Sequence, residues 1–171
     1  TYTWPERYGV TPWKDGHASE IRRLDYEPVG MVTAAPGGAR WYHQHFSAGA
    51  DLETFAGIDQ AGMAEWCDLV HGLVHRFRRS TKPMLAAIDG VAVGGGLEMT
   101  LHCDVRFAAR TARLGQPEVN INFIPPVGAT QALVRLIGRP AALRLLYGGE
   151  LVAADAALAL GLVDELTEPD D

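Results

Sequence analysis

Two glutamates and a run of glycines near the middle of the chain have residue types and spacing suited to proton transfer beside a bound anion. At Gly94–Gly96, absent side chains let a ligand lie against backbone N–H groups. A helix that begins there would offer unpaired N–H groups to a negative oxygen. Glu98 follows the glycines, Glu118 comes later, and carboxyl groups can donate or accept protons. The alternatives are an ordinary tight turn for the glycines and a surface salt bridge for either glutamate.

Short elements around these residues are expected to position them. The apolar run Met84–Ile88 lies between Pro83 and Gly90, which predicts a buried strand. A helix is expected over Leu97–Leu101, directly after the glycines. Alternation predicts a strand at Val105–Ala109, and a turn at Gln116–Pro117 is expected to present Glu118.

Helical segments flank this central stretch. From Gly57 onward, apolar residues recur at helical spacing up to Phe77, which predicts an amphipathic helix that faces the core. The cations that follow, from Arg76 to Lys82, either complement the negative helix terminus or contact phosphates. Further along, glycine and proline signals divide three helices and one strand, expected at residues 128–137, 140–148, 153–160 and 162–166.

These motifs resemble, in type and order, the core of the crotonase superfamily and its enoyl-CoA hydratase/isomerase family. The residues that carry the resemblance are Phe46–Leu52, Lys82–Pro83, Ile88–Gly90, Gly94–Glu98, Cys103–Asp104, Gly115–Glu118 and Ala159–Asp164. The resemblance implies an α/β fold, a crotonase-like spiral of ββα units. It also implies that part of the usual N-terminal elements and the C-terminal helical region are lacking in this sequence.

The resemblance assigns catalytic roles to four positions. The backbone N–H groups of Ala50 and Gly95 would form an oxyanion hole for a thioester oxygen. Glu98 would accept a proton from water, and Glu118 would deliver one to the α-carbon of the substrate. This division of labour requires the two environments to hold the carboxyls in different protonation states.

Substrate-binding positions and one departure also follow from the resemblance. The positions are Ala48, Asp51, Gly94 and Pro126. Hydratases of the family have glycine where this chain has Pro126, and that glycine offers an N–H to the catalytic water. Proline has no N–H to offer. CoA enters only as part of the substrate, and no other cofactor and no metal are expected.

The function that these residues favour is that of an enoyl-CoA hydratase, a lyase of fatty acid metabolism that adds water to a 2-enoyl-CoA thioester. Because of Pro126, an isomerase or another crotonase-type reaction, such as decarboxylation or C–C cleavage, stays open. A non-catalytic acyl-CoA-binding or assembly subunit is the alternative from another class. The presence of both glutamates and both signature loops argues against it.

The domain organisation is expected to be simple. Residues 1–20 are interpreted as an N-terminal extension or arm and residues 21–171 as the crotonase-like core. Within the core, a hairpin is expected at residues 21–33, and the segment between residues 34 and 45 is too short for the helix and strand that the family has there. The resemblance and the apolar surface left by missing helices predict a homotrimer or dimer of trimers.

Composition limits the partners. The chain has 171 residues with 47% hydrophobic and 21% charged residues, which is typical of one globular domain. Its formal net charge of −6 argues against nucleic acid and anionic membranes as partners. Without a transmembrane run or a signal-peptide pattern, a cytoplasmic location is expected.

His71 and His75 lie one helical turn apart without the glutamate of a zinc motif, so a metal site there is not favoured.

Overall fold

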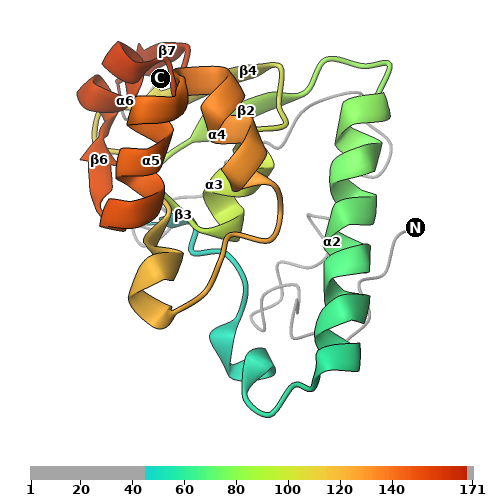
Figure 1. Cartoon of the computed structure of the whole chain (residues 1–171). Helices are drawn as coiled ribbons and strands as arrows, with labels where there is room; N and C mark the ends of the chain where they lie inside the picture. The colour runs from blue at the N-terminus through green and yellow to red at the C-terminus, as the bar shows by residue number, and fades with distance from the viewer. Residues whose placement is uncertain (1–44, 169–171) are drawn as a thin grey trace.

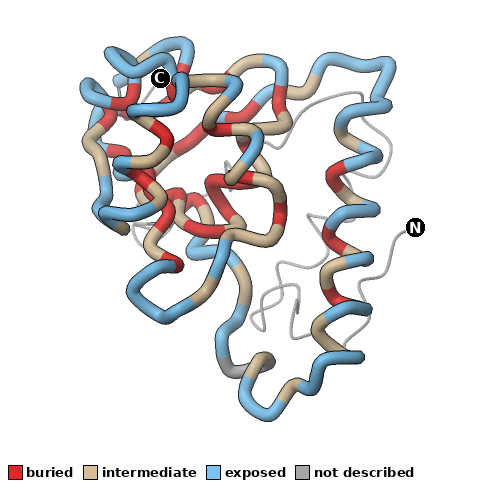
Figure 2. Tube along the Cα trace, in the orientation of Figure 1, coloured by how far each residue is buried: buried red, intermediate tan, exposed pale blue. Residues whose placement is uncertain are grey.

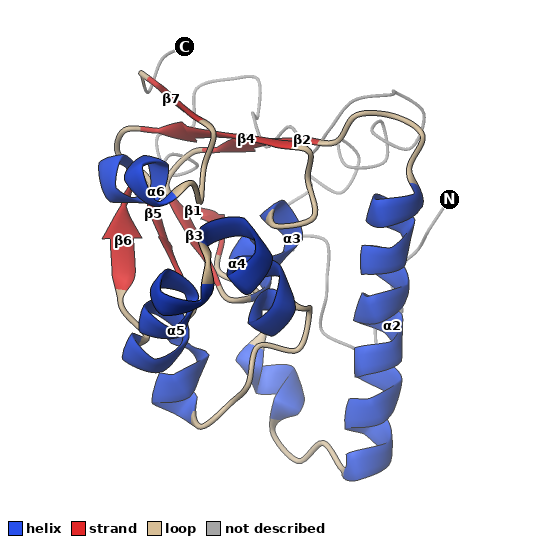
Figure 3. Ribbon diagram, turned by 45° about the horizontal axis from the view of Figure 1, so that its top comes forward, coloured by secondary structure: helices blue, strands red, loops and turns tan. Residues whose placement is uncertain are grey.

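The computed structural model describes residues 45–168, and within that range the strands form two small sheets set at an angle to one another (Figure 3). The first sheet is parallel, in the order β2 (Leu85–Ile88), β4 (Val105–Ala109) and β7 (Glu165–Thr167). The second has the order β1 (His45–Ser47), β3 (Val91–Val93), β5 (Arg113–Gly115) and β6 (Leu151–Ala153), with only β6 antiparallel. The predicted arm, hairpin and shortened segment lie outside the described residues.

Consecutive strands from β2 to β5 alternate between the two sheets. The turn from β2 into β3 is made at Gly90, whose φ of +78° is in the left-handed region that favours glycine. The successive strands β2 and β3 are followed by α3 (Gly95–Thr100). The successive strands β4 and β5 are followed by the 3-10 helix η5 (Pro117–Ile121). The chain therefore advances as strand–strand–helix units, which confirms the predicted α/β class.

The helix α2 (Gln60–Arg79) lies beside the sheets as a separate column (Figure 1). It begins at Asp59, whose carboxylate accepts a hydrogen bond from Gly62 N at 2.8 Å. Its buried residues Trp66, Val70 and Val74 recur at helical spacing (Figure 2), so the amphipathic prediction is confirmed. The short 3-10 helix η4 (Leu52–Phe55) precedes it, and the ring of Phe55 meets that of Trp66 edge-on at 5.0 Å.

Three helices cover the other side of the sheets: α4 (Ala129–Ile137), α5 (Arg139–Gly148) and α6 (Ala154–Leu160). Their bounds agree with prediction to within a residue or so. The final strand does not, because β7 begins at Glu165 and not at residue 162. Leu162 and Val163 are buried, but Leu162 N donates to Ala157 O and so closes the end of α6. Their burial, and not a strand, explains the apolar pattern.

The main core lies between the two sheets and the helices α4 to α6. Its fully buried large side chains include Ile88, Leu97, Leu114, Leu133 and Leu162. A second, smaller cluster joins α2 to the rest through Trp66, Val70, Val74 and Val127. No helix among residues 45–168 has the length and apolar character needed to cross a membrane.

Candidate active site

The loop after β1 and the start of α3 meet through their glycines. A Cβ at Gly49 would lie 2.9 Å from Gly95 N, and a Cβ at Gly95 would lie 3.7 Å from Ala50 N. Since a Cβ lies about 2.5 Å from its own backbone nitrogen, the nitrogens of Ala50 and Gly95 are within roughly 6 Å of each other. That separation allows both N–H groups to approach one oxygen. Their role as an oxyanion hole stays a prediction.

The close contact between β1 and α3 depends on a third glycine. A Cβ at Gly96 would lie 2.4 Å from Ser47 O and 2.6 Å from Ser47 Cβ, which is closer than any side chain can come. Gly94, the N-cap of α3, has a φ of +55° and is the point where β3 turns into the helix. The glycine run therefore brings a strand end and a helix start together, which is more specific than an ordinary tight turn.

Glu98 extends from α3 into the interior. Its side chain is fully buried, and its Oε1 accepts hydrogen bonds from Val127 N and Ala129 N, both at 2.9 Å. Its Oε2 is buried and has no hydrogen-bond partner among the described residues. Burial raises the pKa of Glu98 to about 7, with the charge of Glu118 adding to this and the backbone N–H groups opposing it.

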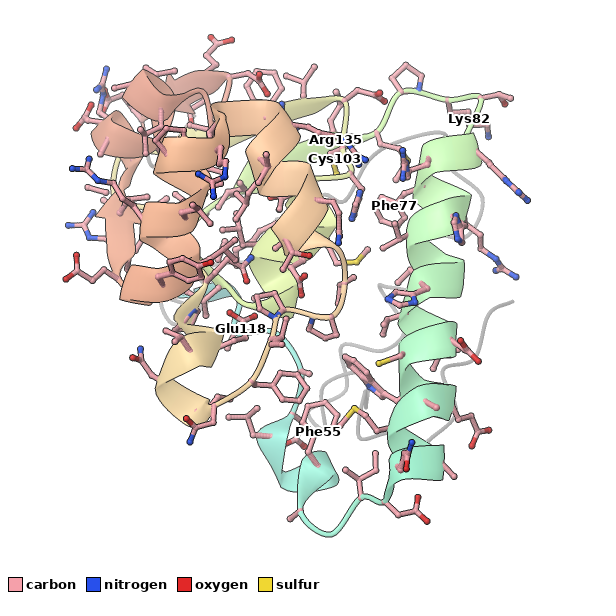
Figure 4. The ribbon with its side chains drawn as sticks, viewed as in Figure 1. Phe55, Phe77, Lys82, Cys103, Glu118 and Arg135 are labelled. Atoms are coloured by element: carbon pink, nitrogen blue, oxygen red, sulfur yellow. The ribbon has the colours of Figure 1, made fainter. Side chains whose placement is uncertain are left out.

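Glu118 reaches the same region from η5. Its Oε1 lies 3.0 Å from the position that a Cβ of Gly94 would occupy, so the carboxylate covers the start of α3 (Figure 4). Burial raises the pKa of this carboxyl as well. In the amide orientation that satisfies its neighbours, Gln116 donates to both oxygens of Glu118 at 2.9 Å. Neither glutamate is therefore the surface salt-bridging residue that was the alternative.

Two buried carboxyls beside a pair of backbone N–H groups can perform acid–base chemistry on a bound carbonyl compound. Burial raises the pKa of both carboxyls, and the charge of Glu118 raises the pKa of Glu98 further. One carboxyl can then act as acid while the other acts as base at near-neutral pH. The buried Oε2 of Glu98, which has no partner among the described residues, can still accept a hydrogen bond.

The other predicted site residues are distributed around this centre. Gly94 lies next to the carboxylate of Glu118. Pro126 directly precedes Val127, whose N–H donates to Glu98. Ala48 and Asp51 are exposed on the same loop as Ala50. Their binding to substrate, like that of Gly94 and Pro126, stays a prediction.

Several residues that shape the site were not assigned a role from the sequence. Gln116 was recognised only as part of a turn, although its place in the motif before Glu118 was a signal. The donors Val127 N and Ala129 N are backbone groups, and no residue type marks them.

Within residues 45–168, no group of three or more His, Cys, Asp or Glu residues could hold a metal ion.

Two aspartates of the family motifs, Asp104 and Asp164, form hydrogen bonds that connect elements of the fold. Asp104 accepts a hydrogen bond from Met84 N at 2.7 Å and so holds the start of β2. Asp164 accepts one from Arg106 N at 2.7 Å and pairs with the buried guanidinium of Arg106 at 2.7 Å. These contacts account for both aspartates without a catalytic role.

The amino-acid sequence is similar to those of known proteins. Residues 40–171 match the family described as enoyl-CoA hydratase/isomerase. The chain is 37% identical over 147 residues to the short-chain-enoyl-CoA hydratase of Clostridium acetobutylicum, covering 86% of this chain and 54% of that protein. It is 45% identical over 124 residues to the peroxisomal bifunctional enzyme of Danio rerio, covering 72% of this chain and 16% of that one.

Solved structures show the same similarity in three dimensions. The enoyl-CoA hydratase of Bacillus anthracis superposes with a TM-score of 0.71 at 37% identity, covering 75% of this chain and 50% of that one. The chain thus spans only part of the length of each of these relatives. Because the match over residues 40–171 includes the strand–strand–helix units and the helices α3 and η5 that carry the two glutamates, the chain belongs to the enoyl-CoA hydratase/isomerase family and has the crotonase fold.

Proposed function

We propose that the protein is an enoyl-CoA hydratase, which adds water to a 2-enoyl-CoA to give the 3-hydroxyacyl-CoA. The observation that carries the proposal is the pairing of two buried carboxyls, Glu98 and Glu118, at the glycine start of α3. Isomerases of the family commonly need only the second of them. A buried second carboxyl with raised pKa is costly to keep, and hydration is the reaction that uses both.

The oxyanion hole is proposed to supply the electrostatic part of catalysis. The thioester oxygen would accept hydrogen bonds from Ala50 N–H and Gly95 N–H, which stabilise the negative charge of the enolate-like transition state. Removing one such donor typically costs about 3–4 kcal/mol of transition-state stabilisation. Since α3 has only six residues, the N–H groups themselves, and not a long helix dipole, would provide this stabilisation.

The carboxyl pair is proposed to move the protons. Glu98 takes a proton from water as the water oxygen bonds to the β-carbon, and Glu118 gives its proton to the α-carbon as the double bond is lost. The substrate gains one water overall, and a proton must then pass from Glu98 back to Glu118. The hydrogen bonds from Gln116 would orient the Glu118 carboxyl during this exchange.

Pro126 favours a second candidate, an enoyl-CoA isomerase or another crotonase-type reaction on the same enolate. Without an N–H at residue 126, a catalytic water would have to be held by the carboxyls alone. In an isomerase, Glu118 alone could move a proton between two carbons on the same face of the substrate. An acyl-CoA-binding subunit without activity is the third candidate, and the two buried carboxyls argue against it.

The test compares two substrates on the unaltered protein and on three variants. Hydration of 2-butenoyl-CoA is followed by mass spectrometry of the 3-hydroxybutanoyl product in heavy-oxygen water, and isomerisation is followed with a 3-enoyl-CoA. For a hydratase, Glu98→Gln and Glu118→Gln should each lower hydration by at least ~10²-fold while acyl-CoA still binds. For an isomerase, only Glu118→Gln should abolish turnover.

Pro126→Gly provides the third comparison. If positioning of the water limits hydration, restoring the N–H should raise the rate of hydration. A folded Pro126→Gly protein that has lost activity would contradict the assignment as a hydratase, because the proline would then shape a pocket for a different reaction.

A further inference from the structure

The loop between η5 and α4 supplies the hydrogen bonds to Glu98, although it has no regular secondary structure. Residues 122–128 contain Pro125 and Pro126 and end at Gly128, whose φ is +110°. Two of the donors to Glu98 Oε1 come from this region, Val127 N directly and Ala129 N at the start of α4. Contacts from other elements can therefore help to fix its peptide planes.

Two histidines contact the carbonyl groups of this loop. His71 of α2 places Nε2 2.7 Å from Pro126 O, and His102, just after α3, places Nε2 3.0 Å from Val127 O. A carbonyl oxygen only accepts hydrogen bonds, so each Nε2 must carry a proton. The ring of His102 also packs against the loop, because a Cβ at Gly128 would lie 3.4 Å from its Nε2.

The histidines and Glu98 contact opposite edges of the same peptide units. In a trans peptide, the C=O of one residue and the N–H of the next point in opposite directions. The unit whose carbonyl meets His71 is the unit whose N–H, on Val127, donates to Glu98. The next unit has its carbonyl on His102, and its N–H, on Gly128, lies between the two donors Val127 N and Ala129 N and lowers the pKa of Glu98.

We propose that His102 and His71 are positioning residues for Glu98: each holds the carbonyl edge of a peptide unit whose N–H edge faces the Glu98 carboxylate. A planar unit that is hydrogen-bonded at both ends is both oriented and polarised, so its N–H is a better donor. The inference rests on the proposed function in one respect only, that Glu98 is the base.

The electrostatic surroundings agree with this arrangement. Burial lowers the pKa of His102 and Arg78 of α2 lowers it further, while the contact with Val127 raises it, so His102 is neutral near pH 7. The N–H groups of residues 127–129 lower the pKa of Glu98, against burial and the charge of Glu118. Loss of the histidines should therefore raise the pKa of Glu98 and leave it protonated at neutral pH.

The experiment measures the titration of Glu98 by carbon NMR in the unaltered protein and in four variants. His102→Leu and His71→Leu remove the donors, and His102→Gln keeps an N–H donor near the same place. His75→Leu is the matched control, because His75 is exposed on the same helix one turn away. We expect the pKa of Glu98 to rise by about one unit in either donor-loss variant, with recovery in His102→Gln and no change in His75→Leu.

The pH dependence of kcat/KM is a second measurement, and it should not change if the histidines have a purely structural role. The acidic limb of the kcat/KM profile should shift to higher pH with the Glu98 titration, while KM for the acyl-CoA changes less than about twofold. An unchanged Glu98 titration in folded His102→Leu and His71→Leu proteins would overturn the proposal. If His102→Leu does not fold, the titration of Glu98 in His71→Leu tests the proposal, because His71 is exposed and its replacement leaves no cavity in the core.

Failure of the proposed function would be recognised separately. Absence of any turnover of 2-butenoyl-CoA or a 3-enoyl-CoA by the unaltered protein would overturn the hydratase and isomerase assignments. The NMR titration does not depend on turnover, so it alone would then support or overturn the positioning of Glu98 by the two histidines.

Discussion

Glu98 is expected to lower the stability of the protein at neutral pH, because its carboxyl is buried and its pKa is raised from 4.5 to about 7. Between these values the folded state binds the proton more tightly than the unfolded state. The free energy of unfolding should therefore fall as pH rises through this range and level off above it. Glu98→Gln removes the titrating group, and a glutamine oxygen can still accept from Val127 N and Ala129 N.

The variant Glu98→Gln should thus be more stable than the unaltered protein, by up to roughly 3 kcal/mol at about pH 8. Urea unfolding at several pH values measures the difference, which should shrink toward zero near pH 4. A Glu98→Gln protein that is less stable at about pH 8 would show that the ionised carboxylate is well solvated.

At the scale of elements, Gly95 and Gly96 are adjacent in the sequence but should respond differently to a methyl group. In Gly96→Ala the Cβ would lie 2.4 Å from Ser47 O, so β1 and α3 must separate. In Gly95→Ala the nearest atoms are at 3.6 and 3.7 Å, which is ordinary contact. We expect Gly96→Ala to lose about 2 kcal/mol or more of stability and Gly95→Ala to stay within about 1 kcal/mol.

Gly95→Ala should nevertheless lose activity, because its methyl group would lie against Ala50 N–H, where the thioester oxygen is proposed to bind. Urea unfolding and turnover of 2-butenoyl-CoA, measured on both variants, separate the two effects. Equal losses of stability in both variants would mean that β1 and α3 do not meet as closely as described.

The contact between β4 and the segment before β7 is expected to depend on Asp164. Its carboxylate pairs with Arg106, whose side chain is 6% exposed, so Asp164→Ala leaves a buried guanidinium without its counter-ion. We expect a loss of about 2–3 kcal/mol in urea unfolding. The matched control is Asp155→Ala, because its partner Arg110 is exposed and that pair should contribute less than about 1 kcal/mol. Similar losses in both variants would contradict this difference.

Elements with strong local signals could be predicted from the sequence, and elements defined by distant contacts could not. The amphipathic pattern predicted α2, and glycine and proline signals bounded α4, α5 and α6. The strands β1, β3, β5 and β6 were missed because three residues show no periodicity. They exist because their neighbours in the sheet, far away in sequence, offer backbone hydrogen bonds.

The same distinction applies to the site. Glu98, Glu118 and the glycines carry residue types that indicate chemistry, so they could be selected from the sequence. His71 and His102 contact carbonyl groups that only the fold brings close, whereas Gln116 stands two residues before Glu118. Whether Ala50 and Gly95 bind an oxygen depends on a ligand, and it stays a prediction.

At the scale of the whole molecule, exposed apolar side chains lie on α5, β6 and α6, and we expect them to contact further copies of the chain. This face contains a hollow of about 600 Å³ lined by Ala141, Arg144, Leu145, Tyr147, Gly148, Glu150, Val152 and Leu160. Tyr147 is 74% exposed beside it. We expect a homotrimer or dimer of trimers, to be measured by light scattering at micromolar concentration. A monomer would count against this expectation, and Tyr147→Lys should weaken an assembly that uses this face.

The alternation of strands between two sheets also affects the order in which the protein can fold during synthesis. Because β2 and β3 belong to different sheets, they do not pair with each other, and within residues 45–168 the partner of β2 is β4, which is made later. Glu98 depends on later synthesis too, since its donors are Val127 and Ala129. A nascent chain halted before residue 127 would hold this carboxyl without those two donors, so the site of Glu98 is completed only after residue 129 has been made.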